Sequence, residues 1–85
     1  MTRAEAARKL CEQLQRDVFK IVPPGMGHWP ACVGDADVEF VVALTAWEAT
    51  GRDEQRLTVR AAYNELLEAW HEAARQYHQQ GHPAR

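Results

Sequence analysis

The feature that most constrains this chain is a long apolar pattern that runs from Asp53 to Gln79. Apolar side chains recur there at alternating steps of four and three residues, which places them along one side of a helix. The members of this stripe are Val59, Tyr63, Leu66, Trp70, Ala73 and Tyr77. A helix of about 25 residues is about 38 Å long. The rest of a chain of 85 residues must therefore pack along it.

The apolar surface of this predicted helix is wider than contact with one other helix requires. The residues that flank the stripe are Ala62, Leu67, Ala69 and Ala74, where a free-standing coiled coil usually carries charge. We therefore expect at least two neighbouring helices. Glu68 and His71 have the spacing that di-iron helical bundles use, but both fall on or near the opposite side from the stripe. We predict that this pair faces solvent.

A first helix is predicted over residues 3–21. Thr2 and Glu5 have the spacing of a capping box at its start, and Pro23 and Pro24 end it. The apolar residues at helical spacing are Ala7, Leu10, Cys11, Leu14, Val18 and Ile21.

A further helix is predicted over residues 35–50. Asp35 and Asp37 can accept hydrogen bonds at its start, and Gly51 suits its end. The face formed by Phe40, Val41, Leu44 and Trp47 is apolar, and Val38, Val42 and Thr45 adjoin it. Residues 38–44 also alternate between apolar and other side chains, as a strand does, and residues 18–22 could pair with them. The alternative is an α+β fold with a small β-hairpin from 18–22 and 38–44.

We expect an all-α fold: a small three-helix unit in a single domain over residues 1–85, with residues 82–85 as a disordered tail. A chain of this length buries only a modest share of its surface, about 60 %. Homodimerisation would enlarge the core, so we predict a homo-oligomer.

The connection over residues 22–34 is longer than most links between packed helices. Within it, Met26, His28 and Trp29 are the candidate binding residues, because thioether and large amphipathic side chains are common in binding surfaces. The simpler interpretation is that Trp29 covers one end of the bundle. The aromatic residues Phe40, Trp47 and Trp70 could line an inter-helix pocket under this loop, although aromatic side chains in such stripes usually belong to the core.

Composition excludes several classes of function. The net charge of −2 and the pI of about 6.0 give no basic patch for nucleic acid. No apolar run approaches the length of a membrane span, and no secretory signal is present, so we expect a cytoplasmic protein. In that compartment Cys11 and Cys32 are expected as two buried thiols. Arginine outnumbers lysine and alanine is abundant, which is typical of a GC-rich bacterial genome.

The sequence contains no set of residues that indicates an enzyme. It has no serine, and neither cysteine has the neighbours of an activated thiolate. Gly25-Met26-Gly27 lacks the lysine that a phosphate-binding loop requires. Cys11, His28 and Cys32 lack the paired spacing of a metal site. We therefore expect no catalytic residue, no cofactor and no metal.

Three functions fit these observations. The first is a non-enzymatic interaction, adaptor or modulator protein that acts as a homodimer, with the second and third helices at the subunit interface. The second is a module that binds an apolar small molecule in the inter-helix pocket. The third is a helix-turn-helix regulator whose last helix would present Arg52, Arg56 and Arg60, although the acidic composition disfavours nucleic acid as a partner.

Overall fold

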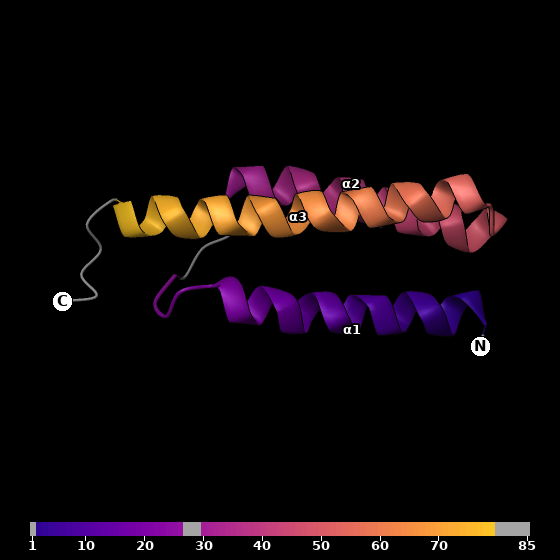
Figure 1. The fold of residues 1–85 in the computed structure, drawn as a ribbon, viewed down its shortest axis with the longest axis horizontal. Helices are drawn as coiled ribbons and strands as arrows, with labels where there is room; N and C mark the ends of the chain where they lie inside the picture. The colour runs from indigo at the N-terminus through magenta and orange to yellow at the C-terminus, as the bar shows by residue number, and fades with distance from the viewer. Residues whose placement is uncertain (1, 27–29, 80–85) are drawn as a thin grey trace.

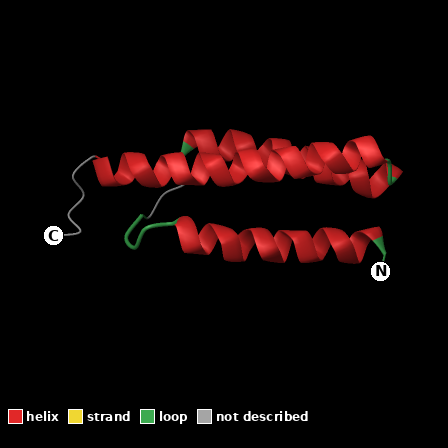
Figure 2. Cartoon of the chain, in the orientation of Figure 1, coloured by secondary structure: helices red, strands yellow, loops and turns green. Residues whose placement is uncertain are grey.

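The structure, a computed structural model, describes residues 2–26 and 30–79. It contains three helices, α1 (Arg3–Ile21), α2 (Ala31–Thr50) and α3 (Asp53–Gln79), and no strand within those residues (Figure 1, Figure 2). The predicted all-α fold is confirmed. The alternative hairpin is wrong, because residues 18–21 belong to α1 and residues 38–44 to α2. Residues 82–85, the predicted tail, lie outside the described part of the chain.

The helix pair α2 and α3 forms an antiparallel hairpin that is packed along its length, and α1 lies beside this hairpin, parallel to α3 (Figure 1). Contact between α2 and α3 is far more extensive than the contact that either makes with α1. The molecule is elongated, with extents of 48 × 20 × 16 Å. Its largest fully buried side chains are Phe40, Leu66 and Val33, all from α2 and α3. The hairpin therefore holds most of the core.

The predicted stripe of α3 faces this core. Val59, Leu66, Trp70 and Ala73 are buried, and the tyrosines at the two remaining positions are half-buried. In α1, Ala7 and Leu14 are buried and the other predicted apolar residues are half-buried. The amide of Glu5 donates to the Thr2 hydroxyl at 3.1 Å, as the predicted cap requires.

Helix α2 begins four residues earlier than predicted, at Ala31 rather than Asp35. Pro30 occupies the cap position, and its carbonyl accepts from the amides of Val33 and Gly34 at 3.1 Å. The physical reason is burial: Val33 has an exposed fraction of 0 %, so a helical start at Ala31 places it in the core. Asp35 and Asp37 therefore lie after the first turn of the helix, and neither side chain caps it.

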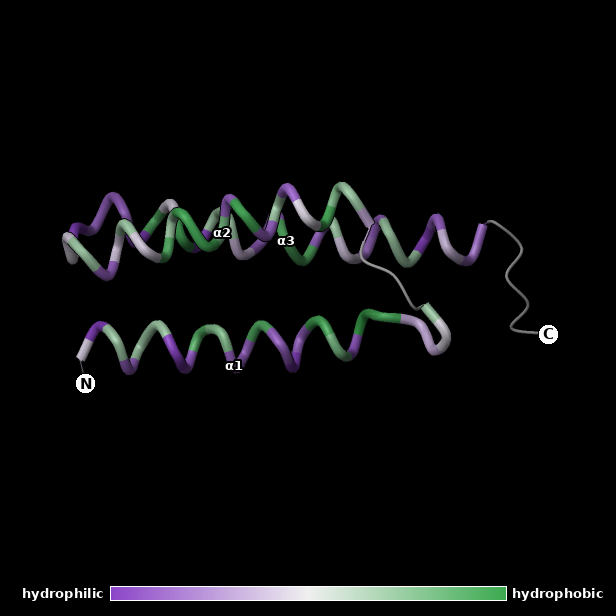
Figure 3. The backbone as a smooth tube through the Cα atoms, turned by 180° about the vertical axis from the view of Figure 1, so that it is seen from behind, coloured by the Kyte–Doolittle hydropathy of each residue, from purple (hydrophilic) through white to green (hydrophobic). Residues whose placement is uncertain are grey.

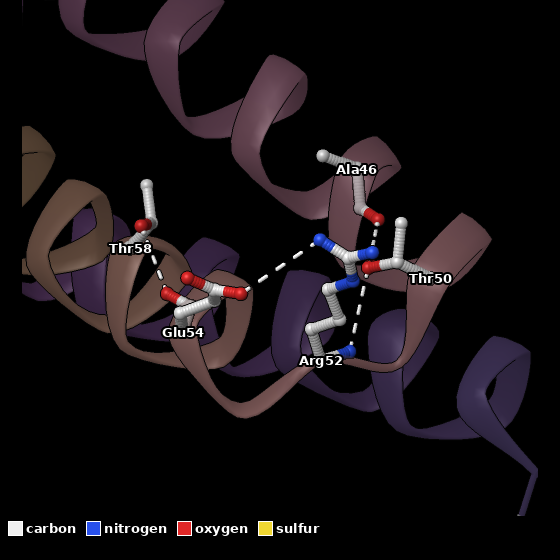
Figure 4. Close-up of polar contacts among 5 residues, drawn as sticks. All are labelled: Ala46, Thr50, Arg52, Glu54 and Thr58. Atoms are coloured by element: carbon white, nitrogen blue, oxygen red, sulfur yellow. Dashed lines mark hydrogen bonds and ion pairs between the residues drawn. The ribbon is translucent and has the colours of Figure 1, made fainter.

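A tight turn joins α2 to α3 and fixes the hairpin (Figure 4). Gly51 adopts the left-handed conformation with φ +67°, and its amide donates to the Trp47 carbonyl at 2.7 Å. The Thr50 hydroxyl donates to the Ala46 carbonyl at 2.9 Å and accepts from the Arg52 amide at 3.3 Å. These bonds satisfy backbone groups that a helix end leaves unpaired.

The segment after α1 turns sharply at Pro23–Met26. Gly25 has φ +87°, and the Met26 amide donates to the Pro23 carbonyl at 3.3 Å, which is the pattern of a type II turn. The Tyr77 hydroxyl donates to the Pro24 carbonyl at 3.5 Å. The turn therefore lies against the C-terminal part of α3.

Candidate functional site

The outer side of α2 exposes three valines, which we call the α2 valine face: Val38, Val41 and Val42. Their exposed fractions are 61 %, 51 % and 64 %. No lysine or arginine occurs in α2, and hydrophobic residues recur along the helix (Figure 3). A helix with this composition is normally covered all round. The α2 valine face is therefore a candidate contact surface.

A groove of about 480 Å³ separates α1 from α2, and we call it the α1/α2 groove. It is lined almost entirely by apolar side chains: Cys11, Leu14, Val18, Phe19, Val22, Phe40, Val41, Leu66 and Trp70, with Gln15 and Asp37. Phe40 and Trp70 are buried in it, whereas Phe19 is 85 % exposed. Since Val41 also lines this groove, the groove and the α2 valine face are continuous.

A second groove of about 1040 Å³ lies between the N-terminal halves of α1 and α3, and we call it the α1/α3 groove. Its apolar lining is Ala6, Leu10, Trp47, Leu57, Val59 and Tyr63. Its polar lining is Arg3, Gln13, Asp53, Arg56, Arg60 and Asn64, with Gly51 at one end. The two grooves share no residue.

The structure divides the predicted binding residues between different places. Phe40 and Trp70 line the α1/α2 groove, whereas Trp47 is half-buried and lines the α1/α3 groove. Met26 is half-buried and packs against the core. The other two candidates from the loop, His28 and Trp29, lie outside the described residues.

A hydrogen bond between side chains joins α1 to α3 beside the core. The Tyr63 hydroxyl donates to Asp17 Oδ2 at 2.5 Å, and the Tyr63 ring packs edge-on against Phe40 with ring centroids 5.9 Å apart. Burial raises the pKa of Tyr63, and the hydrogen bond to the Asp17 carboxylate raises it further. The sequence pattern places Tyr63 on the core side but contains no signal for its pairing with Asp17.

The two cysteines are free thiols in different surroundings. Cys11 is half-buried in the α1/α2 groove, where burial raises the pKa of its thiol and the nearby carboxylates of Glu48 and Asp37 raise it further. Cys32 is exposed at the start of α2. The prediction that both thiols are buried is wrong for Cys32, because the earlier start of α2 places it on the helix surface.

The described residues give no support to a metal site or to a membrane-spanning helix. Glu68 and His71 are both exposed, as predicted. No group of three or more histidine, cysteine or acidic side chains is placed to hold a metal ion in residues 2–26 and 30–79. Among the same residues, none of the helices combines the length and apolar character needed to cross a lipid bilayer.

Comparison with models of known protein families, with curated proteins and with solved structures finds no match to this chain.

Proposed function

We propose that this chain is a non-enzymatic, cytoplasmic interaction protein that acts as a homodimer, with the α2 valine face at the centre of the subunit interface. The observation that supports the proposal most is the exposure of Val38, Val41 and Val42 on a helix without basic residues. In one copy, α3 covers one side of α2, and α1 covers another side only in part. A second copy would supply the missing cover.

The magnitude of this burial decides how tight such a dimer can be. Full burial of a valine side chain contributes about 1.5 kcal/mol, so a valine that is half exposed in the monomer contributes about 1 kcal/mol. Six valines from two copies then contribute about 6 kcal/mol, which is comparable to the cost of association. Phe19, at the rim of the adjoining groove, must add to the interface. Because the valine contribution is offset by the cost of association, two copies of Phe19 leave a net gain of about 4 kcal/mol, and we expect a dissociation constant on the order of hundreds of micromolar to one millimolar.

The test is a double substitution, Val38→Glu with Val42→Lys, studied by sedimentation velocity from micromolar to millimolar concentrations. The two positions are four residues apart, so the new side chains form a favourable pair on the helix surface and leave the net charge unchanged. The helix should keep its stability, because both new residues favour helix more than valine does. We expect the wild type to dimerise and the variant to remain monomeric with the same circular dichroism spectrum.

A second double variant, away from the α2 valine face, controls for the effect of adding two surface charges. Thr58→Glu with Ala61→Lys places the same two charges one turn apart on exposed positions of α3 and also leaves the net charge unchanged. This variant should dimerise as the wild type does. A wild-type protein that stays monomeric at all concentrations, or a dimer that survives the valine substitutions, would refute the proposal.

A second candidate function is the binding of an apolar small molecule in the α1/α2 groove. The observation that favours it is the position of Phe40 and Trp70, both of which line this groove, whose volume of about 480 Å³ is in the usual range for ligand sites. A thermal-shift screen with apolar compounds tests it. A binding compound should raise the melting temperature and change the fluorescence of Trp70, and a screen without any shift would remove this candidate.

A further inference from the structure

The α1/α3 groove combines an apolar floor with arginines on one wall. Leu10, Trp47 and Val59 contribute to the floor, and Leu57 is 67 % exposed at its edge. The lining residues of α3 extend from Asp53 to Asn64, which is about three helical turns or 16 Å. This length suits one short helix laid along the groove.

The arginines of this wall have no partner within the described residues. Arg56 and Arg60 are exposed, lie one turn apart on α3, and their side chains make no hydrogen bond or ion pair there. Arg3, across the groove on α1, uses its Nε to donate to the Glu48 carbonyl at 2.9 Å, which leaves its terminal nitrogens near the groove. Asp53 is the one acid that lines the groove within the described residues. The wall is therefore positively charged on a chain whose net charge is negative.

From this charge pattern we infer that the α1/α3 groove binds an acidic amphipathic helix of another protein. Apolar side chains at spacings of three and four residues would contact the floor, and flanking carboxylates would pair with Arg56 and Arg60. A nucleic acid fits less well, because its phosphates would lie against Asp53 and would leave the apolar floor unused. This inference does not depend on the homodimer, because the groove shares no residue with the α1/α2 groove or the α2 valine face.

The test uses two fluorescent peptides of about 14 residues, which form three to four helical turns. Both carry leucines at helical spacing; the first has glutamates beside them and the second has lysines at the same positions. Binding to the full-length protein is measured by fluorescence anisotropy at low and high salt. We expect the acidic peptide to bind at least about ten times more tightly than the basic one at low salt, with the difference reduced at high salt.

Variants then locate the site. Arg56→Gln with Arg60→Gln should weaken binding of the acidic peptide about tenfold, because two exposed charge pairs are lost. Arg8→Gln with Lys9→Gln removes the same charge from exposed positions of α1 outside the groove and should change binding less than about twofold. Leu57→Gln should also weaken binding, since it removes an apolar contact at the edge of the groove.

Several results would overturn the inference. They are the absence of acidic-peptide binding at near-millimolar concentrations, equal binding of both peptides, and full binding by the Arg56→Gln, Arg60→Gln variant. Tighter binding of a duplex oligonucleotide would assign the groove to nucleic acid instead. If the arginine variant dissociated the homodimer in sedimentation velocity, the occupant would be a second copy of this chain. Sedimentation tests the homodimer and anisotropy tests the groove, so failure of one proposal is distinguishable from failure of the other.

Discussion

Tyr63 on α3 donates a 2.5 Å hydrogen bond to Asp17 on α1, across 46 positions of the sequence. This side-chain hydrogen bond links the two helices, and α1 has far less contact with the hairpin than α2 and α3 have with each other. The docking of α1 therefore depends on this contact together with Ala7 and Leu14, its two buried side chains.

Removal of the phenol hydroxyl should loosen α1. Tyr63→Phe keeps the ring against Phe40 but deletes the bond to the carboxylate, and we expect a loss of about 1 kcal/mol of unfolding free energy, because Asp17 is only half-buried and regains water. Chemical denaturation followed by circular dichroism measures it. Tyr77→Phe is the comparison: the Tyr77 hydroxyl donates to the Pro24 carbonyl over 3.5 Å, and the loss of so long a bond should cost less. Equal losses for both variants would contradict this role of Asp17.

Alkaline pH should destabilise the fold through the same residue. The pKa of Tyr63 is raised in the folded state by burial and by Asp17, so the folded protein holds this proton more tightly than the unfolded chain. The stabilisation is therefore complete below the pKa of an ordinary tyrosine, about 10, and is lost as the pH rises through the folded pKa. Phenolate absorbance and melting temperature, measured together against pH, test this. The Tyr63→Phe variant should show a shallower alkaline decline, and an unchanged decline would contradict it.

The turn between α2 and α3 should depend strongly on Gly51. Its φ of +67° strains any side chain, and a Cβ there would lie 2.5 Å from Arg3 Nη1. We expect Gly51→Ala to lower stability by about 1–2 kcal/mol. Gly34→Ala is the matched control: Gly34 lies within α2, where alanine is favoured over glycine by up to about 1 kcal/mol, so this change should raise the melting temperature. Similar effects from both substitutions would rule out the conformational explanation.

The two thiols should react at different rates. Cys32 is exposed, whereas Cys11 is half-buried and its pKa is raised by burial and by the carboxylates of Glu48 and Asp37. Because the thiolate is the reactive form, iodoacetamide should modify Cys32 first in the native protein. Timed alkylation followed by peptide mass spectrometry measures the order. In denaturant the difference should largely disappear, and faster labelling of Cys11 in the native state would contradict the described packing.

The sequence by itself determined the helices and their buried sides. The regular spacing of Val59, Leu66 and Trp70 predicted the long helix and its core face, because a helix places residues three and four apart on one side. It also placed Glu68 and His71 on the exposed side. Local chemistry at Thr2 and Gly51 predicted a helix start and a helix end, since both act through neighbouring backbone groups.

Only the tertiary structure decided which elements meet. The apolar pattern could not distinguish Phe40, which is buried against Tyr63, from Val41, which is left half exposed, because this depends on where α1 and α3 lie around α2. The start of α2 at Ala31 likewise follows from the burial of Val33. Three further findings depend on residues that are far apart in sequence. Trp47 and Trp70 line different grooves, Tyr63 pairs with Asp17, and Arg56 lies beside an apolar floor. Helical periodicity carries no information about such contacts, because it predicts which side of a helix is buried and not which element packs against that side.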